Sequence, residues 1–162
     1  MYLIQWKTIN YNMKTTNIIA IASHKGGVGK TTTAATLGSL LSSQGKKTLL
    51  VDLDAQRNLT STFLGSRFAP EMTLYEAFCG QCALPISNVR ENLDIVPSSL
   101  DMGALDTVIA SRIQRETILR QLLKTVKEDP FIFILDRLEQ LPKDGLSLDS
   151  GSDHSVQGSH IQ

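Results

Sequence analysis

Short apolar runs alternate along this chain with longer segments in which apolar residues recur three or four positions apart. The runs are rich in aliphatic and β-branched residues, which is typical of strands buried on both faces of a parallel sheet. They occupy residues 18–22, 48–52, 93–97 and 131–135. Because helical segments separate them, the pattern predicts an α/β fold with a mostly parallel β-sheet flanked by helices.

The clearest helical segment covers residues 30–44, where the apolar residues Ala34, Leu37, Leu40 and Leu41 recur three or four positions apart. Gly45 follows this segment and offers the left-handed conformation that ends many helices. The segment comes directly after the apolar run 18–22, with glycines between the two. The order is therefore strand, glycine loop and helix.

Further helices are expected downstream. Thr73 and Glu76 form the T-x-x-E pattern of a capping box, which predicts a short helix over residues 73–78. Ser98, Ser99 and Asp101 introduce another helix. From Arg115 to Lys127 the apolar residues have the spacing of an amphipathic helix packed on a sheet. They are Ile118, Leu119, Leu122, Leu123 and Val126.

Composition limits the possible partners. The chain has 162 residues, of which 41% are hydrophobic, so it can form one compact domain with its own core. Its 16 basic residues balance its 16 acidic ones, which gives no overall electrostatic footprint for nucleic acid or membrane and leaves room only for a local patch.

Residues 1–12 lack the charged and apolar segments of a secretory signal, and no stretch approaches transmembrane length. We therefore expect a cytoplasmic protein. Met13 begins M-K-T-T-N directly before the first predicted strand. Residues 1–12 are accordingly either an N-terminal extension to a domain that spans residues 13–136, or a flexible arm.

Neither the cysteines nor the histidines near the end of the chain indicate a metal site. Cys79 and Cys82 have C-x-x-C spacing, but no second pair completes a zinc site, and ordinary cysteines are favoured over a redox pair. Residues 137–162 diverge from the preceding pattern, and residues 149–162 are rich in Ser, Gly, Asp, Gln and His, which predicts disorder. His154 and His160 are expected to be solvated there rather than to bind a metal.

The glycine loop reads K-G-G-V-G-K-T-T from Lys25 to Thr32. Without Cβ atoms, its glycines let successive backbone N–H groups turn toward a bound phosphate at the positive end of the next helix. Lys30 would reach the β- and γ-phosphates, and the Thr31 hydroxyl would bind Mg²⁺. The alternative is a glycine-rich turn that binds nothing.

This loop departs from the general pattern G-x-x-x-x-G-K-[ST], because His24 stands at the first glycine and Lys25 follows it. In this deviation the sequence resembles the family of ParA, Soj and MinD ATPases. The resemblance implies that Lys25 crosses a dimer interface to the phosphates of the partner's nucleotide, although a solvated loop lysine is the alternative. The implied nucleotide-binding residues are Lys25, Gly26, Gly27, Val28, Gly29, Lys30, Thr31 and Thr32.

Acidic residues end the second apolar run, in the sequence D-L-D-A-Q-R-N-L-T from Asp52 to Thr60. Carboxylates at the carboxyl end of a parallel strand lie where they can orient water or Mg²⁺. The segment resembles the D-x-D-P-Q-G-N motif of the ParA branch, which implies that Asp54 positions the attacking water and Asp52 lies near the metal and the switch loop. The structural alternative is that the two aspartates cap the following helix.

Two positions of this motif depart from the family. Ala55 and Arg57 stand where proline and glycine are usual. Two interpretations of Arg57 remain open: it restricts the switch loop, or it adds a contact to a phosphate or partner.

The last apolar run ends at Asp136, which fits the second acidic motif of P-loop ATPases, whose carboxylate holds metal-bound water. The family continues D-x-P-P-S, but here Arg137 and Leu138 follow and neither proline is present. The implied metal residues are Thr31, Asp52 and Asp136. The resemblance covers residues 13–136 and predicts a P-loop NTPase-like fold that is incomplete on its C-terminal side.

The resemblance implies an ATP-binding and ATP-hydrolysing partition protein that uses Mg²⁺ and dimerises with ATP, with Lys25, Lys30 and Asp54 as catalytic residues. It also implies a centromere-binding, ParB-like partner and plasmid or chromosome cargo, whereas the segment that contacts non-specific DNA in the family is missing. One alternative is a non-catalytic interaction protein that pairs with an intact relative. Another is a MinD-like cell-division ATPase, although residues 149–162 are not a membrane-binding amphipathic helix.

Overall fold

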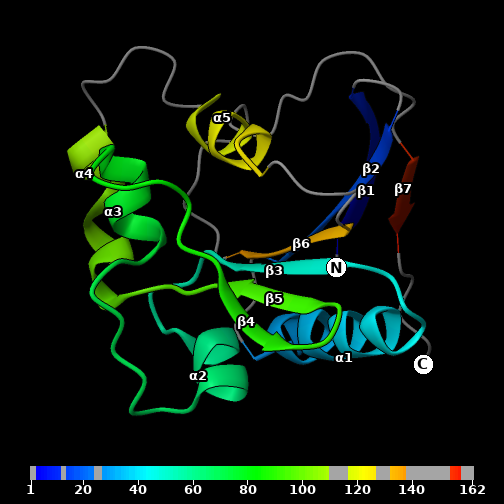
Figure 1. The fold of residues 1–162 in the computed structure, drawn as a ribbon, viewed down its shortest axis with the longest axis horizontal. Helices are drawn as coiled ribbons and strands as arrows, with labels where there is room; N and C mark the ends of the chain where they lie inside the picture. Colours follow the sequence, from blue (N-terminus) through cyan, green and yellow to red (C-terminus); the bar gives the residue numbers. More distant parts are fainter. Residues whose placement is uncertain are drawn as a thin grey trace.

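The computed structural model describes residues 3–11, 14–23, 27–109, 117–126, 132–137 and 154–157. In these ranges seven strands form one sheet in the order β4-β5-β3-β6-β2-β1-β7 (Figure 1). The strands are β1 Leu3–Tyr11, β2 Lys14–Ala22, β3 Thr48–Asp52, β4 Ser87–Arg90, β5 Leu93–Val96, β6 Ile132–Arg137 and β7 His154–Gln157. The helices are α1 Lys30–Ser43, α2 Asn58–Leu64, α3 Leu74–Cys79, the 3-10 helix η1 Leu100–Ala104, α4 Leu105–Ile109 and α5 Ile118–Lys124.

The four central strands of the sheet, β5, β3, β6 and β2, are parallel to their neighbours. Antiparallel strands extend both edges, with β4 beside β5 on one side and β1 and β7 beyond β2 on the other. The sheet as a whole is therefore mixed around a parallel centre. This arrangement confirms the predicted α/β class.

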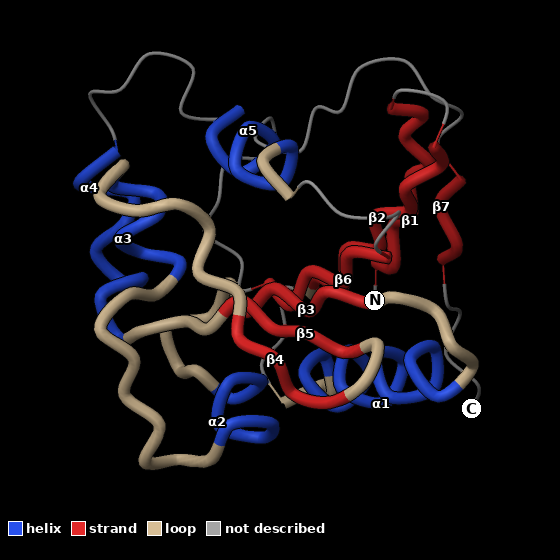
Figure 2. Tube along the Cα trace, viewed as in Figure 1, coloured by secondary structure: helices blue, strands red, loops and turns tan. Residues whose placement is uncertain are grey.

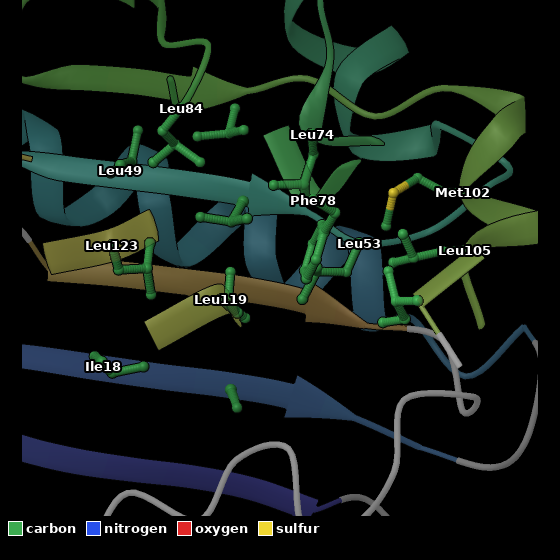
Figure 3. Packing of buried hydrophobic residues seen from close by; sticks show 14 residues of the cluster. Ile18, Leu49, Leu53, Leu74, Phe78, Leu84, Met102, Leu105, Leu119 and Leu123 are labelled. Carbon is green, nitrogen blue, oxygen red and sulfur yellow. The ribbon is translucent and has the colours of Figure 1, made fainter. Parts of the chain in front are cut away.

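Helices cover both faces of the sheet, with α1 and α2 on one side and α3, α4 and α5 on the other (Figure 2). The side chains of β3 alternate between these layers, because Leu49 and Val51 join the core under α3, α4 and α5, whereas Leu50 packs toward α1 and α2. All three are fully buried, and each contributes about 1.5–3 kcal/mol by leaving water. Figure 3 shows the first core, where Leu74 and Phe78 of α3 lie over β3.

Helix α1 confirms the predicted helix almost to the residue. It ends at Ser43 and is followed by Gly45 with φ 74°, in the left-handed conformation expected of a helix end. Gly38 marks its closest approach to the sheet, because a Cβ atom at this position would lie 2.8 Å from Leu50 Cδ2. The absent side chain lets α1 lie directly on β3.

Helix α3 begins with the predicted capping box. The Thr73 N–H and hydroxyl each donate to Glu76 Oε2 at 2.6 Å, and the Tyr75 N–H donates to Thr73 Oγ1 at 3.3 Å. Partial desolvation raises the pKa of the Glu76 carboxyl, but the hydrogen bonds from Thr73 outweigh it and the net pKa is lowered. The ionised form of Glu76 therefore stabilises this helix start.

The structure confirms other predicted helices and strands in part. Strand β5 ends before Pro97, as expected, and the helix introduced by Ser99 begins as the 3-10 helix η1 and continues as α4. The described part of the helix predicted over residues 115–127 is α5, and the strand predicted to end at Asp136 continues to Arg137. No helix in the described part of the chain is long and apolar enough to cross a membrane.

Four elements are additional to those predicted: β1, α2, β4 and β7. The interpretation of residues 1–12 as a flexible arm does not describe Leu3–Tyr11, which pair with β2 at every residue. The disorder predicted for residues 149–162 is wrong at His154–Gln157, where β7 pairs with β1. Backbone pairing at a sheet edge needs few apolar side chains, which explains why composition alone gave no sign of these strands.

Candidate nucleotide-binding site

The carboxyl ends of three parallel strands meet at one edge of the sheet. Asp136 of β6 is the register partner of Asp52 in β3 and of Ile21 in β2. The chain leaves β2 at this edge and reaches the N-terminus of α1 through the glycine loop. In open α/β sheets, ligands bind in the crevice outside such strand ends. The side chain of Asp136 lies outside the described part of the structure.

The described part of the glycine loop has the backbone that only glycine adopts readily. Gly27 has φ 69° and Gly29 has φ 88°, both in the left-handed region. A Cβ atom at either position would meet nothing within 4 Å. Conformation, and not crowding, therefore requires glycine here.

Gly29 is the N-cap of the 14-residue helix α1, and within the described part of the chain no side-chain hydrogen bond caps this helix end and no carboxylate lies in its first turn. The Gly29 carbonyl accepts hydrogen bonds from the Thr33 N–H at 2.8 Å and the Thr33 hydroxyl at 2.9 Å. The first N–H groups of a helix have no carbonyl partner within it, and its dipole is positive at this end. These features together fit a bound phosphate.

The remaining predicted loop residues lie at the start of α1 or before it. Lys30 is the first helical residue and Thr31 the second, and both are half-buried, as is Val28. Thr32 is exposed. Lys25 and Gly26 lie outside the described residues, so their assignments stay predictions.

Asp52 is fully buried and holds the start of α2. Its Oδ2 accepts from the Thr60 N–H at 2.8 Å and the Thr60 hydroxyl at 2.7 Å, and its Oδ1 accepts from the Asp54 N–H at 3.1 Å. Thr60 is the third residue of α2, so Asp52 caps this helix from the neighbouring strand. Asp52 therefore makes the helix-capping contact that the structural alternative predicted.

Asp54 is also buried, with 7% of its surface exposed, and it forms the first residue of a tight turn. Its Oδ1 accepts from the Gln56 N–H at 2.9 Å, and its backbone carbonyl accepts from the Arg57 N–H at 3.0 Å. The Ser98 hydroxyl donates to the same carbonyl at 2.7 Å. The turn therefore has a fixed shape around the Asp54 carboxylate.

Arg57 occupies the left-handed region, with φ 57° and ψ 28°, as the N-cap of α2. This conformation explains why glycine is usual at the position. Its guanidinium Nη2 donates to the Phe68 carbonyl at 2.6 Å, and its Nε is buried without a hydrogen bond among the described residues. Of the two interpretations of Arg57, these contacts favour restriction of the loop.

Sequence reasoning missed Thr60 and the role of Ser98 at this edge. Both side chains are fully buried, and the Ser98 N–H donates to Thr60 Oγ1 at 3.0 Å. The available signal was a polar residue in the first turn after the acidic motif and another directly after a strand stop. Such residues are common in turns, so the signal was weak.

Neither Cys79 nor Cys82 is in a disulfide, and both thiols are half-buried. Burial raises the pKa of the Cys82 thiol, and the Glu76 carboxylate raises it further. Burial likewise raises the pKa of the Tyr75 hydroxyl, and the neighbouring Cys79 raises it further. A raised pKa disfavours the reactive thiolate, which supports the interpretation of Cys82 as an ordinary cysteine.

Comparison with known proteins places the chain in a family. Residues 16–143 match the family described as "AAA domain". The sporulation initiation inhibitor protein Soj of Bacillus subtilis is 36% identical over 123 residues, which are 74% of this chain and 48% of that protein. The chromosome-partitioning ATPase Soj of Treponema pallidum is 38% identical over 121 residues, or 72% of this chain and 46% of that protein. The chain thus spans about half the length of these curated relatives.

Solved structures agree with this relationship. A plasmid partition protein of Borrelia burgdorferi matches with a TM-score of 0.63 and 32% identity, covering 74% of this chain and 54% of that one. An ATP complex of Cyanothece McdA matches with a TM-score of 0.65 and 33% identity, covering 74% of this chain and 46% of that one. Cobyrinic acid a,c-diamide synthase of Mycobacterium smegmatis was solved with a bound ATP analogue and magnesium. It matches with a TM-score of 0.69 and 30% identity, covering 75% of this chain and 50% of that one. The chain therefore belongs to the AAA domain family, and the proteins that it resembles include ParA- and Soj-type proteins with the P-loop ATPase fold.

Proposed function

We propose that this chain binds ATP and Mg²⁺ at the carboxyl edge of β2, β3 and β6 and acts as a ParA-type partition protein. One observation carries the proposal. The left-handed backbone at Gly27 and Gly29 leads into the uncapped N-terminus of α1, beside the strand that ends in Asp52. ATP or an ATP analogue is present in related solved structures, which supports the same ligand class here.

Each residue has a proposed part. Backbone N–H groups from Gly27 to Lys30 bind the phosphates, the Lys30 ammonium neutralises their charge, and the Thr31 hydroxyl holds Mg²⁺. When bound, the metal ion supplies further neutralisation of charge on the phosphates. Asp52 fits direct ligation poorly because both of its oxygens already accept hydrogen bonds, so it acts near the metal and not as a ligand. Asp136, its register partner, contributes indirectly.

In this proposal Asp54 orients the water that attacks the γ-phosphate. The fixed turn around Asp54 supports that role, because a group that positions water must itself be held in place. Lys25 reaches the nucleotide of a second copy, so that ATP favours a homodimer. Partition of chromosome or plasmid DNA is proposed because similar proteins are named as chromosome-partitioning and plasmid partition proteins. A ParB-like partner and a cytoplasmic location are proposed from the family resemblance alone. All three extend beyond the half of those relatives that this chain spans.

A second function is a non-catalytic chain that binds ATP or pairs with an intact relative. The observation in its favour is that the Asp52 carboxylate serves the fold through three hydrogen bonds. Retained nucleotide binding without turnover would identify this function. No described feature favours a MinD-like role.

The test is calorimetric titration of the purified chain with Mg²⁺ and ATP, against Lys30→Ala. Lys46→Ala is the matched control, since Lys46 is an exposed lysine that follows the opposite end of α1. Saturable binding that Lys30→Ala weakens at least tenfold, and Lys46→Ala leaves unchanged, supports the proposal. A folded chain that binds no ATP overturns it. Release of phosphate then separates the catalytic from the non-catalytic function.

A further inference from the structure

A continuous set of buried hydrogen bonds joins Asp52 and Asp54 to Ser98, which follows the end of β5. Thr60 Oγ1 donates to Asp52 Oδ2 at 2.7 Å and accepts from the Ser98 N–H at 3.0 Å. Ser98 Oγ in turn donates to the Asp54 carbonyl at 2.7 Å. Asp52, Thr60 and Ser98 are fully buried, and Asp54 nearly so. We call these four residues the Thr60–Ser98 network.

The network connects three elements at the carboxyl edge of the sheet. Asp52 ends β3, Thr60 lies in the first turn of α2, and Ser98 follows the end of β5. Since water has little access to these groups, a lost hydrogen bond leaves a buried partner unsatisfied, which costs more than the bond itself gains. The end of β5 therefore has a strong preference for one position relative to the acidic turn.

We propose that Thr60 and Ser98 are positioning residues, which fix Asp52 and Asp54 in the geometry that orders water next to the nucleotide. Thr60 acts through the side chain of Asp52, and Ser98 acts through the backbone of Asp54. Neither touches the substrate. The catalytic consequence rests on the proposed ATPase function, whereas the positioning itself does not.

The hydroxyl of Thr60 is tested by Thr60→Val, which keeps the shape and removes the hydroxyl, and by Thr60→Ser, which keeps the hydroxyl. Thr62→Val is the matched control, because Thr62 lies on the same helix, is exposed and donates its hydroxyl proton to the Asn58 carbonyl of its own helix at 2.7 Å. Ser98→Ala tests the second residue separately, should Thr60→Val fail to fold. Far-ultraviolet circular dichroism checks each fold.

The first measurement needs no nucleotide. Amide hydrogen exchange followed by NMR should become at least about tenfold faster at Ser98 in Thr60→Val, since its acceptor is gone, and at Arg57 in Ser98→Ala, since the Asp54 turn loses a support. Thr60→Ser and Thr62→Val should retain the wild-type rates. Unchanged exchange in both Thr60→Val and Ser98→Ala overturns the inference.

The second measurement is steady-state ATP hydrolysis beside calorimetric ATP binding. Positioning predicts a fall in kcat of about tenfold in Thr60→Val and Ser98→Ala, restoration in Thr60→Ser, and a dissociation constant for ATP within about threefold of wild type. A loss of binding equal to the loss of rate overturns the positioning role. If the wild-type chain binds no ATP, the proposed function fails, and the exchange rates still decide whether the network holds the turn.

Discussion

Arg57 donates a 2.6 Å hydrogen bond from Nη2 to the Phe68 carbonyl while its own backbone is left-handed. The side chain therefore stabilises a loop whose backbone conformation is unfavourable for any residue with a Cβ atom. The contact joins the acidic turn to the segment that follows α2. It gives a physical reason for arginine at a position where the family resemblance expects glycine.

Substitution of Arg57 separates these two opposing effects. Arg57→Ala loses the hydrogen bond and keeps the strained backbone, so we expect its free energy of unfolding to fall by about 1.5–3 kcal/mol. Arg57→Gly loses the same bond but relieves the left-handed strain, so it should be about 1 kcal/mol more stable than Arg57→Ala. Urea unfolding measures both values.

Asn92→Gly is the control for this comparison, because Asn92 has φ 59° but asparagine tolerates that conformation well. Its stability should change by less than about 0.5 kcal/mol. Equal stabilities of Arg57→Ala and Arg57→Gly would mean that backbone strain at this position has no measurable cost.

Gly38 provides a test of the packing between α1 and β3. Gly38→Ala gains about 1 kcal/mol of helix propensity, but its Cβ would lie 2.8 Å from Leu50 Cδ2, and Leu50 is fully buried. Overpacking costs about 1–3 kcal/mol, so the net effect should be a loss of about 1 kcal/mol. Urea unfolding of Gly38→Ala measures this loss.

The physical cause can be isolated with a double-mutant cycle. In a Leu50→Ala background the clash is removed, so Gly38→Ala should become stabilising. Thr36→Ala, at an exposed position of the same helix, should be neutral or slightly stabilising in both backgrounds. If Gly38→Ala destabilises both backgrounds equally, Leu50 is not the source of the cost.

The elements that the sequence predicted well are those whose signals are local. Strand β3 is a continuous apolar run that ends in an aspartate, and helix α1 has a helical periodicity followed by a glycine. The capping box of α3 is complete within four residues. Helix α2 has only seven residues, and its cap comes from Asp52, six residues before it begins. The acidic motif raises such a cap only as an alternative, and no local pattern identifies Thr60 as the residue that Asp52 contacts.

The residues of the site likewise fall into those that a local motif reveals and those that only the fold brings together. The glycines and the aspartates could be found because each motif is contiguous, whereas Ser98 joins them only through the fold. Its partners Asp54 and Thr60 are 44 and 38 residues away in sequence. Serine after a strand stop carries no information about such a partner, so the network required the three-dimensional arrangement.

The start of α3 should depend on pH. The pKa of Glu76 is lower in the folded protein than its ordinary value of about 4.5, so its contribution to stability is present above that value and is lost as the pH falls through the folded pKa. Glu76→Gln should therefore remove part of the loss of stability seen between neutral and acidic pH. Chemical unfolding at pH 7 and below pH 4 measures the difference.

Two further variants define this effect. Thr73→Ala removes the cap itself and should cost about 1 kcal/mol at neutral pH. Glu71→Gln is the control for a change of charge, since Glu71 is exposed and takes no part in the capping box. A pH dependence that is the same in Glu76→Gln and in the wild type would contradict the assigned role of Glu76.

Strand β1 should protect the edge of β2 from pairing with other chains. Its residues Leu3–Tyr11 pair with β2 along nine positions and in turn support β7, yet they precede the segment that matches the AAA domain family. A chain that starts at Met13 would leave the outer edge of β2 without this partner, and an unpaired strand edge is a template for pairing with other chains. In the absence of nucleotide we therefore expect this shorter chain to form higher oligomers or to aggregate, as measured by light scattering during size-exclusion chromatography.

Removal of residues 158–162, which follow β7, is the matched truncation and should leave the elution unchanged. If the chain that starts at Met13 elutes like the full chain and keeps the same amide protection in β2, then β1 does not protect this edge.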